Sequence, residues 1–470
     1  MTTIRAPASY EPTSGAVDEA FDAKGAVRPA YAGVLAALEA ASPAATAEAV
    51  AAGVDRDGLV YGAGAKAHRF LVDAVPRVFA AEEWARLEAG LAQRIRALEA
   101  FVSDAFGARE AFRAGVVPAD LLDRCPWFED DVAALPDRGP RVGVAGPDIV
   151  RDARGELLVL EDNVRTPTLM AFAVAARRLV AQALPGAPPP EPVEDALRTA
   201  LLEMAGDGAA VILGRDPGNS DWWELEQLSL TTGWPLVGID DLAAREGRVV
   251  LRADRSPVDV VWRRTIEDRL RGDDGRLTVL GSLLLEPLRN GAVRVLNAFG
   301  SGIADDKRTY VYVERLVRFY CGAEPLLHSV PAWDLAVDEQ RAEALTRLDE
   351  LVFKPRDGAG GAGIVLGAQA SKAQLKKLRA EIDAEPSAWI AQEPVALSTH
   401  PTVIDGRLEP RHVDLRPFVV GGRALPGMSR FAQGAGELVV NCAQGGGGKD
   451  VWVLSEDDGP TTARKPHAAG

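Results

Sequence analysis

Residues 142–165 read VGVAGPDIVRDARGELLVLEDNVR, and this stretch decides how we interpret the fold of the 470-residue chain. Apolar residues dominate 142–150 and 157–160, a composition typical of strands. Residues 152–155 between them, Asp-Ala-Arg-Gly, are typical of a hairpin turn. We therefore expect two antiparallel strands here.

The expected hairpin would bring acidic and amide side chains close together. Pairing of the two strands puts Asp148 beside Glu161, and Glu161 and Asn163 point to one face because side chains alternate along a strand. Two carboxylates and one amide oxygen suit Mg²⁺, which prefers hard oxygen ligands. The alternative is a turn-capping Asp-Asn pair with a solvated glutamate.

A lysine followed by a glycine-rich loop marks residues 353–364, FKPRDGAGGAGI. Backbone N–H groups of such a loop can close over phosphates. The lysine, Lys354, precedes the glycines, so the spacing is not that of a P-loop, and no dinucleotide fingerprint is present. A flexible surface hairpin is the alternative.

Two further strands carry polar residues. In residues 389–395, WIAQEPV, the strand ends in Gln392-Glu393, which suits contacts to an adenine edge and a ribose, or is an ordinary edge strand. Residues 409–418, EPRHVDLRPF, place Arg411 on the face opposite to Arg416 if the strand is regular. Such arginines suit carboxylate or phosphate recognition, or one of them pairs with Asp414 inside the protein.

Composition narrows the class of protein. A formal net charge of -15 argues against non-specific nucleic-acid binding. There is no apolar run long enough to cross a bilayer, so we expect no membrane partner and a cytoplasmic location. Three widely spaced cysteines, Cys125, Cys321 and Cys442, predict neither a disulfide framework nor a zinc site.

The rest of the chain predicts an α/β fold. Periodicity indicates a helix over 81–106, and 209–262 reads as an open α/β unit whose last strand, 258–262, ends in Arg263-Arg264. The remaining expected elements are strands at 209–213, 236–239, 350–354, 388–392, 412–420 and 438–440, helices at 220–232 (capped by Asn219 or Ser220), 277–289 and 305–319, a proline-rich connector at 185–193, and a disordered tail from 455.

Taken in order, these pieces resemble the circularly permuted ATP-grasp type 2 family, relatives of glutathionylspermidine synthetase-like carboxylate–amine ligases. The blocks that carry the resemblance run from about residue 16 to 453, nearly the whole chain. They are 75–78 (VPRV), 160–165 (LEDNVR), 218–220 (GNS), 304–307 (ADDK), 353–355 (FKP) with its glycine loop, 391–398 (AQEPVALS), 409–417 (EPRHVDLRP) and 441–449.

The resemblance implies ATP and Mg²⁺ as cofactors and assigns a role to each block. It implies Mg²⁺ ligands Asp148, Glu161 and Asn163; phosphate contacts from Lys307, Lys354 and the loop glycines Gly358, Gly360 and Gly361; an adenine and ribose pocket of Gln392, Glu393 and Val395; and phosphate-stabilising arginines among Arg165, Arg411 and Arg416. Many ATP-grasp enzymes have an arginine two residues before the first metal aspartate, where this chain has Gly146, so Arg411 or Arg416 is the expected replacement.

The implied domains are a helical lead-in (1–140), the metal-binding part of the grasp (141–205), an open α/β domain (206–300), the nucleotide-binding part (301–454) and the tail (455–470). The implied activity joins a small-molecule or peptide carboxylate to an amine through an acyl phosphate. A phosphotransferase and a non-catalytic nucleotide-binding partner protein are the alternatives. Arg263 and Arg264 are expected either to bind a substrate carboxylate or to pair with Glu267 and Asp268.

Overall fold

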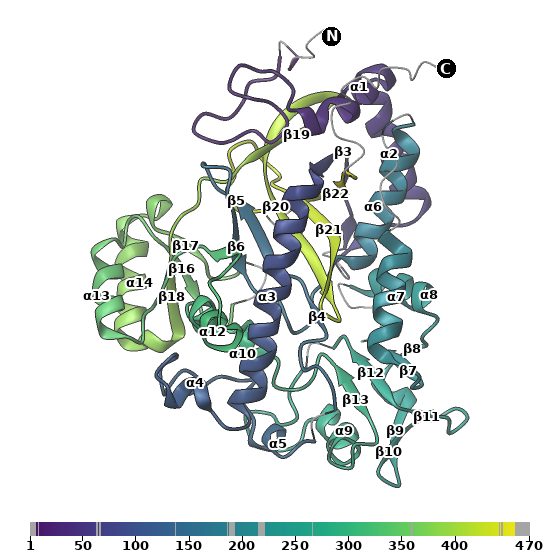
Figure 1. Ribbon diagram of the computed structural model, residues 1–470, viewed down its shortest axis with the longest axis vertical. Helices are drawn as coiled ribbons and strands as arrows, with labels where there is room; N and C mark the ends of the chain where they lie inside the picture. The colour runs from purple at the N-terminus through teal and green to yellow at the C-terminus, as the bar shows by residue number, and fades with distance from the viewer. Residues whose placement is uncertain are drawn as a thin grey trace, which may run out of the picture.

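The computed structural model shows a large central sheet with two smaller lobes (Figure 1). It describes residues 6–7, 9–62, 64, 67–136, 138–185, 187, 193–214, 221–265, 267–358, 361–440, 442 and 445–455. Within these ranges the central sheet has nine strands in the order β14-β6-β5-β20-β21-β22-β3, and β4 and β19 also pair with β20. Their bounds are β3 Val72–Phe79, β4 Val144–Ala145, β5 Asp148–Arg151, β6 Leu157–Glu161, β14 His328–Ser329, β19 Thr399–Ile404, β20 Arg407–Val420, β21 Arg423–Phe431 and β22 Gly447–Val453.

The expected hairpin is confirmed, with Asp148 of β5 opposite Glu161 of β6. The turn is closed by a hydrogen bond from the backbone N–H of Gly155 to the carbonyl of Asp152 at 3.0 Å. The strand expected over 142–150 is instead divided into β4 and β5. Pro147 lies at the break and has no N–H to donate to a ladder.

Helices cover both faces of the central sheet (Figure 1). Helix α3, Ala81–Ala105, matches the predicted helix and lies on one face; α6, Met170–Ala183, and α7, Val193–Ala205, lie on the other. Neighbouring residues of β22 divide between the two cores: Val451 joins the α3 cluster and Trp452 the α6 cluster. Alternation along one strand therefore builds two separate apolar layers.

A four-stranded antiparallel sheet, β15-β18-β16-β17, lies beside α13 and α14 in the left lobe of Figure 1. Phe353, Leu378 and Ala391 belong to its own small core. The bounds are β15 Ala332–Asp334, β16 Val352–Pro355, β17 Val365–Leu366, β18 Trp389–Gln392, α13 Asp338–Thr346 and α14 Lys372–Ala384. The strands expected at 350–354 and 388–392 are β16 and β18.

The second lobe is a parallel sheet in the order β13-β12-β7-β8, beside a three-stranded antiparallel sheet, β11-β10-β9. Asp221 precedes α8 and makes no side-chain cap bond, while Asn219 and Ser220 lie outside the described residues. The bounds are β7 Ala210–Leu213, β8 Leu236–Val237, β9 Leu242–Arg245, β10 Arg248–Leu251, β11 Pro257–Val258, β12 Val260–Arg263, β13 Arg294–Leu296, α8 Trp222–Thr232 and α9 Val279–Arg289.

Two sequence predictions are wrong in detail. The single helix expected from 305 to 319 is broken into α10 (Gly302–Asp305), α11 (Lys307–Tyr310) and α12 (Val313–Cys321). Asp306 takes an extended conformation, and its carboxylate accepts the backbone N–H of Arg308 at 2.9 Å, which caps α11 as a new helix. Residues 438–440 form no strand but an irregular segment along a cavity.

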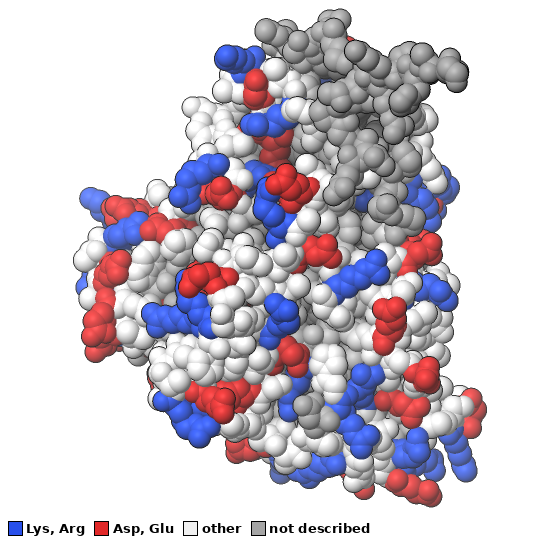
Figure 2. Space-filling view, viewed as in Figure 1, with Lys and Arg blue, Asp and Glu red and all other residues white. Residues whose placement is uncertain are grey.

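Shorter elements complete the described chain: α1 Ala32–Ala41, α2 Pro43–Arg56, β1 Val60–Tyr61, β2 His68–Arg69, α4 Glu110–Arg113 and α5 Asp130–Ala133. Over the described residues, no individual helix has the length and apolarity to cross a bilayer; only the pair Pro29–Ala41 and Pro43–Arg56, bent by 90°, reaches them together. The connector at 185–193 and the tail from 455 lie mostly outside the described residues. Acidic and basic side chains are interspersed on the face shown in Figure 2, without a basic stripe.

Candidate functional site

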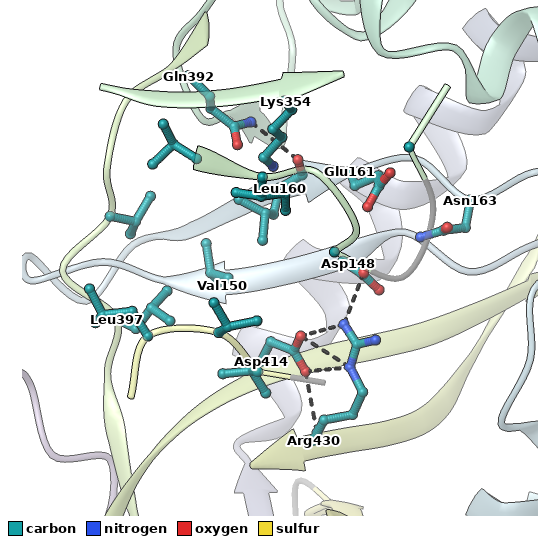
Figure 3. A pocket seen from close by; sticks show the side chains of 18 of the residues that line it. Asp148, Val150, Leu160, Glu161, Asn163, Lys354, Gln392, Leu397, Asp414 and Arg430 are labelled. Carbon is teal, nitrogen blue, oxygen red and sulfur yellow. Dashed lines mark hydrogen bonds and ion pairs between the residues drawn. The ribbon is translucent and has the colours of Figure 1, made fainter. Parts of the chain in front are cut away.

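A cavity of about 410 Å³ lies where the central sheet faces the small antiparallel sheet. Strands β5, β6, β20 and β21 supply one wall and β16, β17 and β18 the other. Figure 3 shows Asp148, Glu161 and Asn163 on one side of the cavity and Leu397 on the other, with Val150 and Leu160 between them. A polar end beside an apolar end suits a ligand with an anionic part and a flat apolar part.

The predicted metal ligands meet at the polar end of this cavity. Asp148, Glu161 and Asn163 all line it. Asp148 is buried and accepts hydrogen bonds from Arg416, through Nε at 2.7 Å and Nη2 at 3.0 Å. Burial alone would raise the pKa of Asp148, but Arg416 and Arg430 outweigh it and lower the pKa to about 2. Asp148 is therefore an anion at neutral pH.

Arg416 occupies the space left by the glycine at position 146. A Cβ atom on Gly146 would lie 3.4 Å from both Cγ and Cδ of Arg416 and 2.9 Å from Cβ of Pro167. The stem of Arg416 thus passes over Gly146 and delivers its guanidinium to Asp148. An arginine from β20 stands next to the position where the family pattern has its own arginine.

Arg411 does not reach the cavity. Its guanidinium bonds to Glu409 Oε2 at 2.8 Å and to the carbonyl of Pro410 at 2.9 Å. Arg416, in contrast, lines the cavity. The strand alternation expected for these two arginines thus agrees with their positions.

Two lysines approach the carboxylates. The Nζ of Lys307 lies 2.8 Å from Glu161 Oε1 and donates to the carbonyl of Gly358 at 2.5 Å. Lys354, on β16, lines the cavity and is buried. Burial lowers the pKa of Lys354 to about 8, with Glu161 acting in the opposite direction. An anion beside Lys354 would stabilise its charged form.

The glycine-rich loop follows β16 and contributes to the same cavity. Gly358 and Gly361 line the cavity, and Gly360 lies outside the described residues. Gly361 has a φ of 80°, a conformation that favours glycine. The start of the loop is fixed because Arg356 Nε donates to both carboxylate oxygens of Asp306, at 2.9 and 2.7 Å.

The predicted nucleotide hinge lines the apolar end. Gln392, Glu393 and Val395 are all in the cavity wall, and Gln392 donates through Nε2 to the carbonyl of Leu160 at 3.2 Å. Glu393 already accepts two bonds from Arg347, at 2.6 and 2.9 Å. A ribose at this position would share the carboxylate of Glu393 with Arg347.

Arg165 also lines the cavity, at its border with the parallel-sheet lobe. It bonds to Asp305 (3.2 Å) and to Asp268 (3.1 Å) and lies over the ring of Trp127. Its backbone N–H donates to Asp305 as well. Arg165 is thus held firmly by neighbours from three parts of the chain.

Sequence reasoning missed Arg430 and the segment 438–440. Arg430 reaches Asp148 Oδ2 at 2.9 Å and also bonds to Asp414. It stands opposite Asp414 in the β20–β21 ladder, so an alternating arginine on the next strand was the available signal. Residues 438–440 line the cavity with apolar side chains. Their apolar composition is also typical of a strand, so it did not indicate this position.

The donor set fits Mg²⁺. Its three members offer only carboxylate and amide oxygens, and the buried Nδ2 of Asn163 has no hydrogen-bond partner among the described residues. Turning the Asn163 amide over would present its oxygen without breaking a bond of that nitrogen. The described residues contain no cluster of three or more His, Cys, Asp or Glu side chains for a metal, so a site built from two carboxylates and an amide is the candidate.

These features define an ATP-grasp protein, in which two facing sheets enclose a cavity lined by both acidic and basic side chains. Residues 76–432 match the family described as "Circularly permuted ATP-grasp type 2". The match covers most of the chain, so the protein belongs to this family. The predicted mixed α/β fold with permuted order is thereby confirmed.

Several curated proteins are similar in sequence to this chain. A protein of Frankia casuarinae with the provisional name glutamate–cysteine ligase 2-2 is 42% identical over 468 residues, which are 94% of this chain and 54% of the relative. One of Frankia alni, provisionally named glutamate–cysteine ligase 2-3, gives the same identity and coverage. The chain therefore spans about half the length of these two relatives. An uncharacterized protein of Mycobacterium leprae is 37% identical, over 94% of this chain and 83% of its own.

A solved structure has a similar fold. A glutathione synthetase-like effector from Globodera pallida, in its apo form, matches with a TM-score of 0.52 over 88% of this chain and 98% of its own. The sequence identity is 13%, so the likeness concerns the fold alone.

Proposed function

We propose that this protein is an ATP- and Mg²⁺-dependent ligase that joins a carboxylate to an amine through an acyl phosphate. The observation that carries the proposal is the polar end of the cavity, where Lys307, Lys354 and Arg416 converge on Asp148 and Glu161. Such a cluster is suited to a reaction that brings two anions together.

The two ends of the cavity would divide the nucleotide between them. Lys307, Lys354 and the glycine loop would bind the phosphates of ATP, and the wall at Gln392, Glu393 and Val395 would receive adenine and ribose. Asp148, Glu161 and Asn163 would hold Mg²⁺. When bound there, Mg²⁺ would supply positive charge beside the phosphate oxygens.

The chain's own cations would lower the barrier to phosphate transfer. A substrate carboxylate oxygen bonds to the γ-phosphorus while the bond to ADP breaks, which crowds negative charge in one place. Arg416 and Lys354 would stabilise that charge in a cavity partly closed to water. An amine nitrogen then bonds to the acyl carbon, phosphate leaves and the nitrogen loses a proton.

The names of the relatives suggest which substrates to test first. Two relatives are provisionally named for a ligation of glutamate to cysteine. We propose amino acids as the first carboxylates and amines to test.

A nucleotide-release screen tests this proposal. The purified chain with ATP and Mg²⁺ is incubated with paired amino acids, amines and polyamines, and ADP, AMP and phosphate are measured. We expect ADP and phosphate in equal amounts only when an acid and an amine are both present. Release of AMP, or no release with any pair, would contradict the proposed reaction.

A further inference from the structure

Arg263, the last residue of β12, is a buried arginine without a hydrogen-bonded partner at two of its nitrogens. Arg263 is 1% exposed, and its Nε and Nη1 atoms have no hydrogen-bond partner among the described residues. A buried charge is costly unless it is paired. Burial lowers the pKa of Arg263 to about 10, with Asp268 acting in the opposite direction.

The carboxylates expected to pair with Arg263 are bound elsewhere. Asp268 accepts from Arg165 at 3.1 Å through Oδ2 and from Trp127 at 3.2 Å through Oδ1. Glu267 accepts the backbone N–H of Arg269 at 2.9 Å. Within the described part of the chain, Arg263 therefore forms no ion pair with either residue, the alternative suggested by the sequence, and the two carboxylates act on it only through their charge.

Arg264, the next residue, also has Nε and Nη1 without a partner among the described residues, but it differs from Arg263 because it forms ion pairs. Its Nη2 reaches Asp221 at 3.3 Å and Glu224 at 3.4 Å, so it is tied to α8. Consecutive residues at a strand end point to opposite faces. Arg263 instead lies over the ring of Phe299, which follows β13. The charge of Arg263 is the one left without an ion pair.

The position of Arg263 connects it to the nucleotide cavity. The parallel strands β7, β12 and β13 end at one edge, where ligands of open α/β sheets bind. Asn297, directly after β13, donates to the carbonyl of Val164 at 2.7 Å, which joins this edge to the segment that lines the cavity. Arg165 lies in the cavity wall, and its positive charge is close enough to Arg263 to lower the pKa of Arg263.

We propose that Arg263 binds a second, non-reacting carboxylate of the acid substrate. This inference rests on the proposed ligase function and names its substrate class, an acid with two anionic groups. The reacting carboxylate would lie beside Arg416, which lines the cavity, whereas Arg263 is not part of that lining. A planar guanidinium with free N–H groups suits a carboxylate.

Two variants separate a ligand site from a structural residue. Arg263→Met removes an unpaired buried charge, so the melting temperature of the free protein should stay the same or rise. Arg94→Met is the matched control: Arg94 is equally buried but pairs with Asp162 at 2.7 and 2.6 Å. That control should melt several degrees lower. A comparable loss in Arg263→Met would overturn the proposal.

Ligand arms test the second carboxylate directly. Binding of L-glutamate and L-glutamine, L-aspartate and L-asparagine, and glutarate and glutaramate is measured by calorimetry in the presence of ATP and Mg²⁺. In each pair an amide replaces one carboxylate. Wild type should bind at least one diacid more tightly than its amide, and Arg263→Met should weaken that diacid by roughly 10- to 100-fold, the loss of a charged hydrogen bond. No preference for any diacid, or an unchanged preference in the variant, would overturn it.

Measuring ATP binding distinguishes failure of the Arg263 inference from failure of the proposed function. ATP with Mg²⁺ should bind wild type and Arg263→Met alike, because Arg263 is outside the nucleotide cavity. Intact ATP binding with no diacid preference rejects only the Arg263 inference. Absence of ATP binding in the wild type rejects the proposed function itself.

Discussion

The guanidinium of Arg416 bonds to both carboxylate oxygens of Asp148, at 2.7 and 3.0 Å, across neighbouring strands β20 and β5. The stem of Arg416 crosses Gly146, where a side chain would collide with Pro167. The glycine at position 146 therefore leaves the space through which Arg416 reaches Asp148. We interpret Arg416 as the arginine for the transferring phosphate, held ready by Asp148.

Replacement of Arg416 tests that interpretation. Arg416→Lys keeps the charge but loses the planar fork, so kcat should fall by about 100- to 1000-fold while ATP affinity changes little. Arg411→Lys is the control on the same strand and should be mild, since Arg411 lies outside the cavity wall. Steady-state kinetics and ATP calorimetry give both values. Equal, large losses in the two variants would show that position in the cavity does not decide the effect.

Glu161 is predicted to be required for Mg²⁺. Glu161→Gln removes one ligand charge, so Mg²⁺-dependent ATP turnover should be lost while the circular dichroism spectrum and melting behaviour remain those of a folded protein. Glu156→Gln, an exposed change in the same hairpin, should have wild-type turnover. Normal turnover in Glu161→Gln would remove this residue from the metal site.

Lys354 is predicted to make ATP affinity depend on pH. Its pKa is about 8 in the free protein, and only the protonated amine attracts phosphate. The contribution of Lys354 to ATP affinity is therefore full below that pKa. It is lost as the pH rises above it, because ATP then has to bind a neutral amine or take up a proton with it. ATP affinity should therefore weaken between about pH 8 and 10.

The matching variants isolate this effect. Lys354→Ala should weaken ATP binding by about 1.5–3 kcal/mol at pH 7, the scale of a charged hydrogen bond. Lys354→Arg should keep most of the affinity and bind independently of pH over that range, because arginine does not titrate there. Calorimetry at several pH values measures both. Wild-type affinity in Lys354→Ala would refute the role.

Asp148 should contribute to stability in a pH-dependent way. Its pKa is lowered from 3.8 to about 2 in the folded protein, so its contribution is full above about pH 4 and is lost as the pH falls towards 2. That contribution is about 2 kcal/mol. Asp148→Asn should be destabilised by at least this amount at pH 7, with a gap to wild type that narrows in acid.

Urea unfolding between pH 7 and pH 2.5 measures the gap. Asp207 is an exposed aspartate in the turn after α7, so Asp207→Asn should unfold like the wild type throughout. A gap for Asp148→Asn that is constant with pH would mean that the two arginines do not lower the pKa of Asp148.

Local patterns predicted much of the site because its parts lie on short strands. A hairpin turn set Asp148 opposite Glu161, and alternation separated Arg411 from Arg416. Lys354 and the glycine loop were contiguous in sequence. In each case, two or three neighbouring residues carried the information.

Contacts between distant segments were not available in the same way. Arg430 joins Asp148 across 282 positions of chain through a sheet order that sequence alone does not give. The carboxylate of Asp306, at the break between helices, also binds Arg356, which lies fifty residues later. Residues 438–440 are apolar because they face a cavity, and their composition alone resembles a strand.

Transfer of an oxygen atom tests the central claim most directly. An acid substrate labelled with ¹⁸O in its reacting carboxylate is incubated with its amine, ATP, Mg²⁺ and the protein, and the released phosphate is analysed by mass spectrometry. Ligation through an acyl phosphate predicts one ¹⁸O atom in each phosphate formed from fully labelled acid. Product and phosphate that form without any ¹⁸O in the phosphate would contradict the account.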